Sequence, residues 1–271
     1  IREVRHRRGF DLWEELFAEN YHTQLVQMAA LENGGFAAEA AELKEELDKY
    51  WDRAKGYYRS QRIIERTDGY TKKDTDLDSA IVIAVIESER RSGAHSVTDP
   101  KVQATVRKLE KLFRETYPLN QDGTPGMVYG RYAGDVYYGG NPWYLVTAYY
   151  AQFYYRLARA SLRMNIKAGS ENADFLGDLL SRLVPENTVM EPGSLAHLEF
   201  LAACVSKADR ILDRLRRVTP SDGQLYEQMD KTDGHPVSSR GIGWAHAAFL
   251  AAARERSLAY KELPAQLLPK D

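Results

Sequence analysis

The chain has 271 residues, which is enough for a sizeable hydrophobic core and for one or two domains. Its 37 Lys and Arg residues nearly balance its 39 Asp and Glu residues, so the formal net charge is -2. A non-specific binder of nucleic acid or of an anionic membrane needs a basic surface, so the composition argues against both classes. The single cysteine, Cys204, can form neither an internal disulfide nor a cysteine-based metal cluster.

The sequence contains no membrane span and no signal peptide that we can recognise. No apolar run approaches the roughly 18–20 residues of a membrane-spanning helix. Residues 1–8 lack the apolar core of a signal peptide and resemble the middle of an element, so we expect an excised or processed chain. Tyrosine outnumbers phenylalanine by 17 to 8, which suits both a carbohydrate site and the amphipathic core of a helical protein.

Hydrophobic periodicity predicts helices along most of the chain. In residues 36–58, apolar side chains recur every three or four positions, with Glu and Lys between them. Residues 80–91 begin with a continuous apolar run after the capping pair Asp78-Ser79. The β-branched content of that run would also permit a buried strand, so helix and strand both stay open there.

The second half of the chain shows the same helical pattern. Asp99-Pro100 is a capping residue followed by proline, which is typical of a helix start, and Pro142 opens a helix that runs to residue 162. Further helices are predicted at 172–183, 193–218 and 239–260. Polar connections rich in Gly and Asn separate the helices at 120–126, 130–141 and 219–236.

Seven or eight helices with few strands predict an all-α fold. Helices that alternate with long loops are typical of a helical toroid, in which loops at one mouth carry the function. We find no change of composition that would mark a second domain, so residues 1–271 are predicted to form a single domain. Residues 262–271 are expected to form an extended tail.

The segment Asp11-Leu12-Trp13-Glu14-Glu15 is the first candidate site. We expect it at the start of a helix that continues to residue 17, where Asp11 would be the N-cap. Trp13 puts an apolar ring beside the Glu14 carboxyl, and desolvation of that kind favours the protonated form of a general acid. The segment is therefore either a helix cap or an acid site.

Two further segments are candidates. Residues 130–143 combine one Arg, one Asp, three Tyr and one Trp with four Gly. Stacked rings beside an arginine suit a polyol site, and a packed structural loop is the alternative. Glu227 lies between turn signals at 221–223 and 233–234, so it is either a solvated loop acid or a general base.

Metal and phosphate motifs are incomplete in the sequence. Asp74-Thr75-Asp76-Leu77-Asp78 imitates the start of a calcium loop, but Ser79 and Val85 occupy the positions that require Gly and Glu. A turn followed by a helix cap is therefore favoured there. The six histidines include no HExxH pair, and no glycine-rich phosphate loop is complete. We expect no cofactor and no metal.

Three segments, taken in chain order, resemble the fungal-type glucoamylases, family 15 of the glycoside hydrolases. They are Phe10-Asp11-Leu12-Trp13-Glu14-Glu15; residues 130–143 with Gly130-Arg131-Tyr132, Asp135, Tyr137-Tyr138 and Gly140-Asn141-Pro142-Trp143; and Glu227-Gln228-Met229-Asp230-Lys231 with Asp233-Gly234, Ser238-Ser239-Arg240 and Trp244. The resemblance implies an (α/α)6 barrel, a six-hairpin toroid. Roughly the first third of the family's catalytic domain has no counterpart here, so the resemblance implies an incomplete barrel.

The resemblance also implies roles for individual residues. Glu14 would be the general acid and Glu227 the general base of an inverting hydrolase. Asp11 would support this pair without touching the sugar. The remaining positions would contact substrate: Leu12, Trp13, Glu15, Arg131, Asp135, Tyr137 and Trp143.

The implied activity is exo-hydrolysis of starch-like α-1,4-glucans with release of β-D-glucose, so starch or a malto-oligosaccharide is the expected partner. One alternative is an inactive or partner-dependent fragment, in which a second chain or segment supplies the missing barrel helices. Another is an all-α toroid that acts on a prenyl diphosphate through Asp74, Asp76 and Asp78. Secretion is implied by the family resemblance alone.

Overall fold

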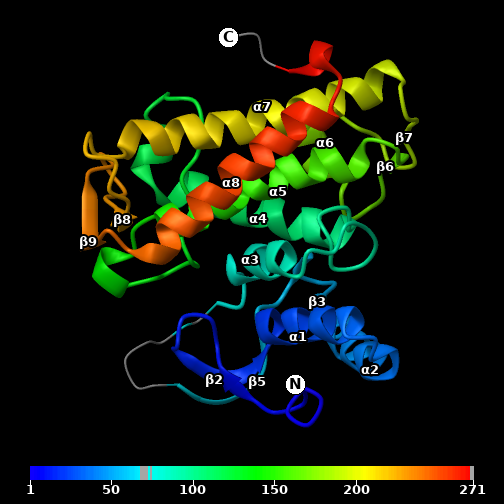
Figure 1. Cartoon of the computed structure of the whole chain (residues 1–271), viewed down its shortest axis with the longest axis vertical. Helices are drawn as coiled ribbons and strands as arrows, with labels where there is room; N and C mark the ends of the chain where they lie inside the picture. The colour runs from blue at the N-terminus through cyan, green and yellow to red at the C-terminus, as the bar shows by residue number, and fades with distance from the viewer. Residues whose placement is uncertain (68–72, 74, 269–271) are drawn as a thin grey trace. The chain divides into compact units, whose positions relative to one another are not determined.

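We describe a computed structural model of the chain, which covers residues 1–67, 73 and 75–268. Within these residues the chain forms eight α-helices (Figure 1), which confirms the predicted helical fold. They are α1 (Tyr21–Asn33), α2 (Ala37–Asp48), α3 (Ala80–Glu87), α4 (Pro100–Thr116), α5 (Tyr144–Ser161), α6 (Ala173–Leu180), α7 (Leu195–Val218) and α8 (Gly243–Glu262).

Short strands connect the helices, and all of their pairings are antiparallel. They are β1 (Gly9–Phe10), β2 (Leu16–Asn20), β3 (Trp51–Asp52), β4 (Tyr57–Tyr58), β5 (Gln61–Thr67), β6 (Ile166–Lys167), β7 (Val189–Met190), β8 (Tyr226–Met229) and β9 (Pro236–Arg240). Single 3-10 turns occur at Pro118–Gln121, Tyr137–Gly139 and Ala265–Leu267. None of the described helices combines the length and the hydrophobicity that a membrane span requires.

The chain divides into two compact units. The first unit comprises residues 1–109 and 132–136, and the second comprises residues 110–131 and 137–271. The single-domain assignment and the extended tail at 262–271 stay predictions. Within the tail, the described residues include the 3-10 turn Ala265–Leu267, and residues 269–271 lie outside the described part.

The first unit combines a small sheet with a helical layer. Strand β2 lies between β1 and β5, and α1 packs against both α2 and α3 (Figure 1). Its core contains a cluster of rings in which Tyr21 lies 5.5 Å from Tyr50 and 5.3 Å from Tyr58. Each buried ring needs a partner for its polar tip: the Tyr58 hydroxyl donates to Asp99 over 3.1 Å.

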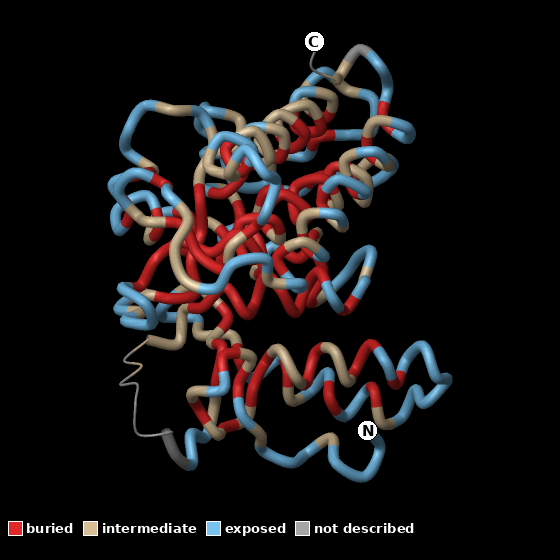
Figure 2. Tube along the Cα trace, turned by 60° about the vertical axis from the view of Figure 1, so that its left-hand side comes forward, coloured by how far each residue is buried: buried red, intermediate tan, exposed pale blue. Residues whose placement is uncertain are grey.

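The second unit is built around α5, which packs against α7 and α8 (Figure 1). Most residues of α5 are buried, and buried segments lie in the interior of the unit while exposed ones lie mainly at its outside (Figure 2). The hydroxyls of Tyr129 and Tyr154 both donate to the buried Glu110 carboxylate, over 3.2 Å and 2.7 Å. At least nine of the 17 tyrosines are under 2% exposed, so much of the tyrosine excess belongs to the core.

In the first half of the chain, one predicted helix was wrong and a second was wrong in part. The helix expected to run to residue 17 is replaced by β2, whose buried and half-buried residues alternate with the period of a strand. The helix expected over 36–58 ends at Asp48, and the chain continues as the β3–β4 hairpin, which turns at Gly56 (φ 71°). Residues 80–87 form a helix, which decides between the two structures left open.

Two further boundaries differ in the second half. Ser239 and Arg240 belong to β9, so the last helix begins at Gly243 rather than at Ser239. The polar connection predicted at 219–236 contains the strand β8. Both errors come from the β8–β9 hairpin, whose pairing depends on contacts that local periodicity does not reveal.

The buried position of His95 is expected to make the stability of the first unit depend on pH. Burial lowers the pKa of its imidazole, although Asp99 and Asp48 favour the charged form. Its Nδ1 lies 2.9 Å from the Tyr21 hydroxyl and its Nε2 lies 3.2 Å from Asp48 Oδ1. Folding therefore holds a neutral imidazole in place.

We predict that the free energy of unfolding falls as the pH drops below about 6.5, because the unfolded chain then binds a proton that the folded chain resists. For this single group the slope is at most about 1.4 kcal/mol per pH unit. Chemical denaturation of the wild type and His95→Gln at several pH values between neutral and mildly acidic tests this. The wild type should lose stability more steeply than the variant, and equal slopes would contradict the prediction.

Candidate active site

The Asp11–Glu15 segment forms a tight turn between β1 and β2. The Asp11 carboxylate accepts the backbone N–H groups of Glu15 and Leu16, over 2.8 Å and 3.2 Å. The predicted capping behaviour of Asp11 is thus present, although a strand rather than a helix follows it. Glu14 has a φ of 60°, a conformation that costs energy for a residue with a side chain and that is common at functional sites.

A buried charge cluster anchors this turn to the start of α3. The indole N–H of Trp13 donates to both oxygens of Asp78, over 3.1 Å and 3.0 Å. Asp78 also accepts the backbone N–H of Ala80 over 2.6 Å, which confirms its capping role. Lys73 forms an ion pair with Asp78, and its ammonium lies 3.6 Å from Asp11 Oδ2, so each buried charge has an opposite neighbour.

Residues 130–143 are called the second motif here. Its Tyr132 belongs to the first unit. Its hydroxyl donates to Glu15 Oε2 over 2.5 Å, and its backbone pairs with Asp78 in an isolated antiparallel bridge. The structure therefore brings Trp13, Glu15 and Tyr132 around Asp78. Asp135 belongs to the same unit and is half-buried.

Glu14 differs from its neighbours because its side chain is exposed, while Trp13 is 8% exposed. The desolvation that the sequence argument requires at Glu14 is not present in this structure. Its role as general acid stays a prediction that depends on the family resemblance. Leu12 is half-buried in the same turn.

Arg131 lies among aromatic rings in the second unit. Its guanidinium carbon is 5.0 Å from the ring centroid of Tyr137 and 5.3 Å from that of Trp143. Arg131 and Trp143 are buried, whereas Tyr137 is 41% exposed. Trp244, 38% exposed, lies 5.8 Å from Trp143 and extends the aromatic group. Rings beside an arginine suit both of the interpretations left open for 130–143, so the polyol site stays a prediction beside the packed structural loop.

Glu227 is a buried strand residue, so its alternative interpretation as a solvated loop acid is wrong. It lies on β8, is 6% exposed and accepts a hydrogen bond from the Ser238 hydroxyl on β9. Ser238 has a φ of 66°, so the strand opposite the acid is also in an unfavourable backbone conformation. The sequence analysis assigned no role to Ser238, because the hairpin that brings it to Glu227 was not predicted.

The β8–β9 hairpin is attached to the second motif. Gln228 pairs with Trp143 in an isolated bridge, and the Met229 N–H donates to the Pro142 carbonyl over 3.0 Å. The Lys231 ammonium donates to the Gly139 carbonyl over 2.7 Å. Within the second unit, these contacts bring the Glu227 strand to the segment that carries Tyr137 and Trp143.

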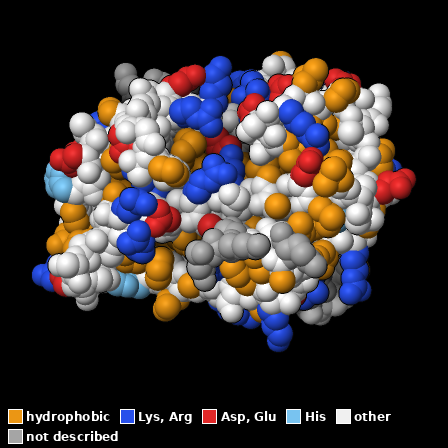
Figure 3. All heavy atoms as spheres, turned by 90° about the horizontal axis from the view of Figure 1, so that it is seen from above, with side chains coloured by type: hydrophobic (Ala, Val, Ile, Leu, Met, Phe, Trp, Pro, Cys, Tyr) orange, Lys and Arg blue, Asp and Glu red, His pale blue; other side chains and the backbone are white. Residues whose placement is uncertain are grey.

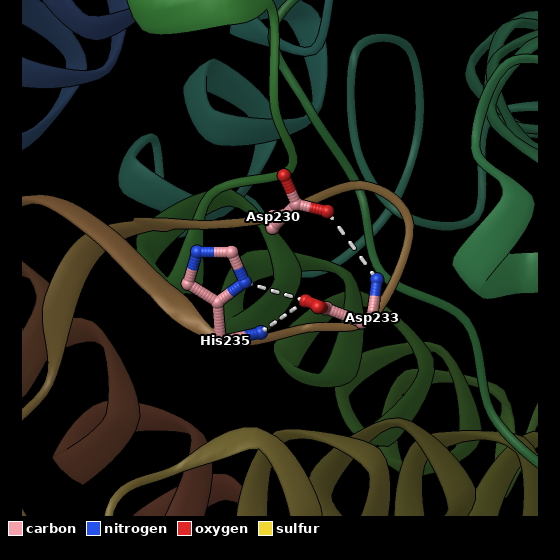
Figure 4. A group of neighbouring side chains, drawn as sticks. All are labelled: Asp230, Asp233 and His235. Atoms are coloured by element: carbon pink, nitrogen blue, oxygen red, sulfur yellow. Dashed lines mark hydrogen bonds and ion pairs between the residues drawn. The ribbon is translucent and has the colours of Figure 1, made fainter.

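Asp230, Asp233 and His235 meet in the turn between β8 and β9 (Figure 4), where one ligand atom of each lies within 4.8 Å of the others. Their side chains bond within the turn: Asp230 accepts the Thr232 N–H over 2.7 Å, and Asp233 Oδ1 lies 2.6 Å from His235 Nδ1. The Asp233 carboxylate raises the pKa of His235, whereas a metal needs the neutral ring. We assign the group to the turn.

The aspartates of the calcium-like sequence have structural contacts. Asp76 accepts hydrogen bonds from Lys55 and from the Tyr57 hydroxyl, each over 2.8 Å. Asp78 holds Trp13 and the start of α3, as described above. Asp74 lies outside the described residues. The two described aspartates are thus engaged within the protein, which favours the turn and cap over the metal motif.

Charged groups of both signs lie among hydrophobic side chains on the face drawn in Figure 3. Positive and negative groups are thus interspersed on that face. Cys204 is buried in α7, and burial raises the pKa of its thiol, so it has the character of a core residue.

Relatives of the chain fall in one family. Glucoamylase P of Amorphotheca resinae is 30% identical, over 93% of this chain and 43% of the relative. Glucoamylase-1 of Schizophyllum commune is 29% identical, over 92% of this chain and 45% of the relative. The chain thus spans less than half the length of these curated relatives.

Solved glucoamylase structures also resemble the chain. The Hormoconis resinae glucoamylase superimposes with a TM-score of 0.83 at 26% identity, over 97% of this chain and 48% of that one. The family 15 glucoamylase from Hypocrea jecorina superimposes with a TM-score of 0.82 at 25% identity, over 94% of this chain and 45% of that one. These matches confirm the predicted (α/α)6-barrel fold class, of which this chain holds a part. The family model of the glycosyl hydrolases family 15 matches residues 3–254, and the chain belongs to that family.

Proposed function

We propose that this chain carries the acid and the base of an inverting, exo-acting glucosidase that releases β-D-glucose from starch-like α-1,4-glucans. The observation that carries the proposal is Glu227, a buried carboxylate held by Ser238 on a hairpin attached to the aromatic segment around Trp143. The family membership supports the substrate class, because the relatives named above are glucoamylases.

In the proposed mechanism, Glu14 protonates the glycosidic oxygen and Glu227 removes a proton from a water on the opposite face of the sugar. Inversion needs a separation of about 6.5–9.5 Å between the two carboxyl groups, which leaves room for that water. The Ser238 hydroxyl fixes the orientation of the Glu227 carboxylate. The exposed Glu14 side chain is accessible to a substrate oxygen.

Substrate binding is proposed for the other candidate site residues of each unit. Arg131 would hold sugar hydroxyls with its planar fork, and Asp135, Tyr137 and Trp143 would shape the acceptor side, where the two rings would cover apolar sugar faces. Glu15, oriented by Tyr132, would accept further hydroxyls, and the backbone at Leu12 and Trp13 would contact sugar. Asp11 would keep the turn in shape. The mechanism requires no cofactor or metal.

A partner-dependent enzyme is a second candidate, favoured by the coverage of less than half of each relative. A further segment or a second chain would then complete the barrel. Maltose hydrolysis by the 271-residue chain, compared with that of the natural gene product that contains it, tests the two. Comparable kcat/KM supports a self-sufficient chain, and activity confined to the natural gene product supports the partner-dependent enzyme.

Glu227→Gln should lower kcat on maltose by about 10²–10⁴-fold, because the substitution removes the base while keeping nearly the same shape. The control is Glu186→Gln, an exposed acid in the same unit, which should retain wild-type activity. Steady-state kinetics and circular dichroism of both variants are the measurements. Retention of most activity by a folded Glu227→Gln would remove Glu227 from the site.

Glu14→Gln should impair maltose hydrolysis far more than hydrolysis of α-glucosyl fluoride, because fluoride leaves with little help from an acid. The ratio of the two kcat/KM losses is the quantity to measure. Glu45→Gln, exposed on α2, is the matched control and should change neither rate. Equal losses on both substrates would show that Glu14 is not the acid.

Arg131→Lys should be almost as harmful as Arg131→Ala. Lysine keeps the charge but loses the planar fork and its stacking on Tyr137 and Trp143. We expect each variant to lose about tenfold or more in kcat/KM on maltose. Near-native kinetics of Arg131→Lys, with a deficit for alanine, would show that charge alone matters there.

A further inference from the structure

A pocket of about 230 Å³ lies in the second unit, and none of its lining residues belongs to the three motif segments. Its walls come from the end of α4, the segment around Gly126 and Tyr129, the end of α6 and the middle of α7. The proposed hydrolysis gives this pocket no role. Its chemistry can therefore be considered separately.

The lining is rich in positive charge. The lining contains three basic side chains, Arg114 of α4 and Lys207 and Arg210 of α7, and one acid, Asp178, which leaves an excess of two positive charges. Lys207 donates to the carboxylate of Glu110, a buried residue outside the lining, over 2.7 Å. When Glu110 is counted, the excess falls to one positive charge. A site of this charge attracts an anion.

The two arginines contact uncharged atoms in the structure. The Arg114 guanidinium lies 3.9 Å from the Met127 sulfur. Arg210 donates to the Ser206 hydroxyl over 2.9 Å. A neutral partner compensates a guanidinium less than a carboxylate or phosphate does, so both groups have capacity for a charge-assisted bond.

The pocket is preformed on one side by a close approach between the loop and α7. A Cβ at Gly126 would lie 2.1 Å from the Arg210 carbonyl oxygen, so only glycine allows this packing. The buried Arg214 holds the same loop by donating to the Leu119 carbonyl over 2.5 Å and to Asp122 over 2.6 Å. Because the rim is already fixed, less conformational entropy is lost when a ligand binds.

The other walls are fixed and apolar. Tyr129 stacks on Tyr150 at 3.7 Å between ring centroids, while its hydroxyl is held by Glu110. Met127, Leu179 and Ile211 contribute hydrophobic surface to the lining. The volume is below the roughly 300–1,000 Å³ of sites for drug-sized ligands, so a smaller molecule fits.

We propose that this pocket binds a small organic anion, with its carboxylate or phosphate group between Arg114 and Arg210 and a compact apolar body against Met127, Leu179 and Ile211. The arginine pair supplies the recognition of the anionic group, and the apolar wall selects against inorganic ions.

Isothermal titration calorimetry of the 271-residue chain with benzoate, phenyl phosphate and benzyl alcohol tests this. At least one of the two anions should bind, and benzyl alcohol, which keeps the ring without the charge, should bind about tenfold or more weakly. Arg114→Gln and Arg210→Gln should each weaken the binding of the anion about tenfold or more. The control is Arg217→Gln, an exposed α7 arginine paired with Asp213, which should leave the affinity unchanged.

Binding of benzoate alone would identify a carboxylate ligand, and binding of phenyl phosphate alone would identify a phosphate ester. Rising NaCl should weaken the binding of either anion, which tests the charge without any substitution. The proposal is overturned if neither anion binds at about 10 mM. It is also overturned if benzyl alcohol binds equally well, or if salt and both folded variants leave the affinity unchanged.

Discussion

The candidate site residues of the second unit depend on the main-chain contacts that attach the β8–β9 hairpin to residues 139–143. Gln228 pairs with Trp143, and the Met229 N–H donates to the Pro142 carbonyl over 3.0 Å. The N–H of Trp143 in turn donates to the Tyr129 carbonyl over 2.8 Å, close to Arg131 in the chain. Segments separated by more than eighty residues are thereby held together by the backbone rather than by flexible side chains.

Buried carboxylates are the second constraint, because an acid removed from water must find donors or counter-charges. In the first unit, Asp78 accepts hydrogen bonds from the Trp13 indole and from the Ala80 N–H at the start of α3, and it pairs with the Lys73 ammonium. In the second unit, Glu110 accepts hydrogen bonds from two tyrosine hydroxyls and from the Lys207 ammonium. The abundant tyrosines satisfy this need, because each ring fills the core while its hydroxyl reaches a buried acid. Composition had left this role and a sugar site both open.

The predictable part of the fold is the part with local signals. The Asp99-Pro100 start and the long apolar stripe at 193–218 correspond to α4 and α7. The β3–β4 and β8–β9 hairpins were missed, because their strands are short and their stability comes from non-local contacts. The same limit applies to the candidate site residues. Arg131, Tyr137 and Trp143 lie close together both in the sequence and in the structure, whereas Ser238 contacts Glu227 only because of the hairpin. The exposure of Glu14 also could not be foreseen from Trp13 beside it.

The central claim is that Glu14 and Glu227 act as the acid and base of an inverting reaction. The most direct test is the proton NMR spectrum of the glucose released from maltose by the natural gene product that contains this chain, recorded before the anomers equilibrate. The β-anomer should appear first, because water attacks the face opposite to the departing sugar. Initial release of the α-anomer would show a retaining mechanism and would contradict the account.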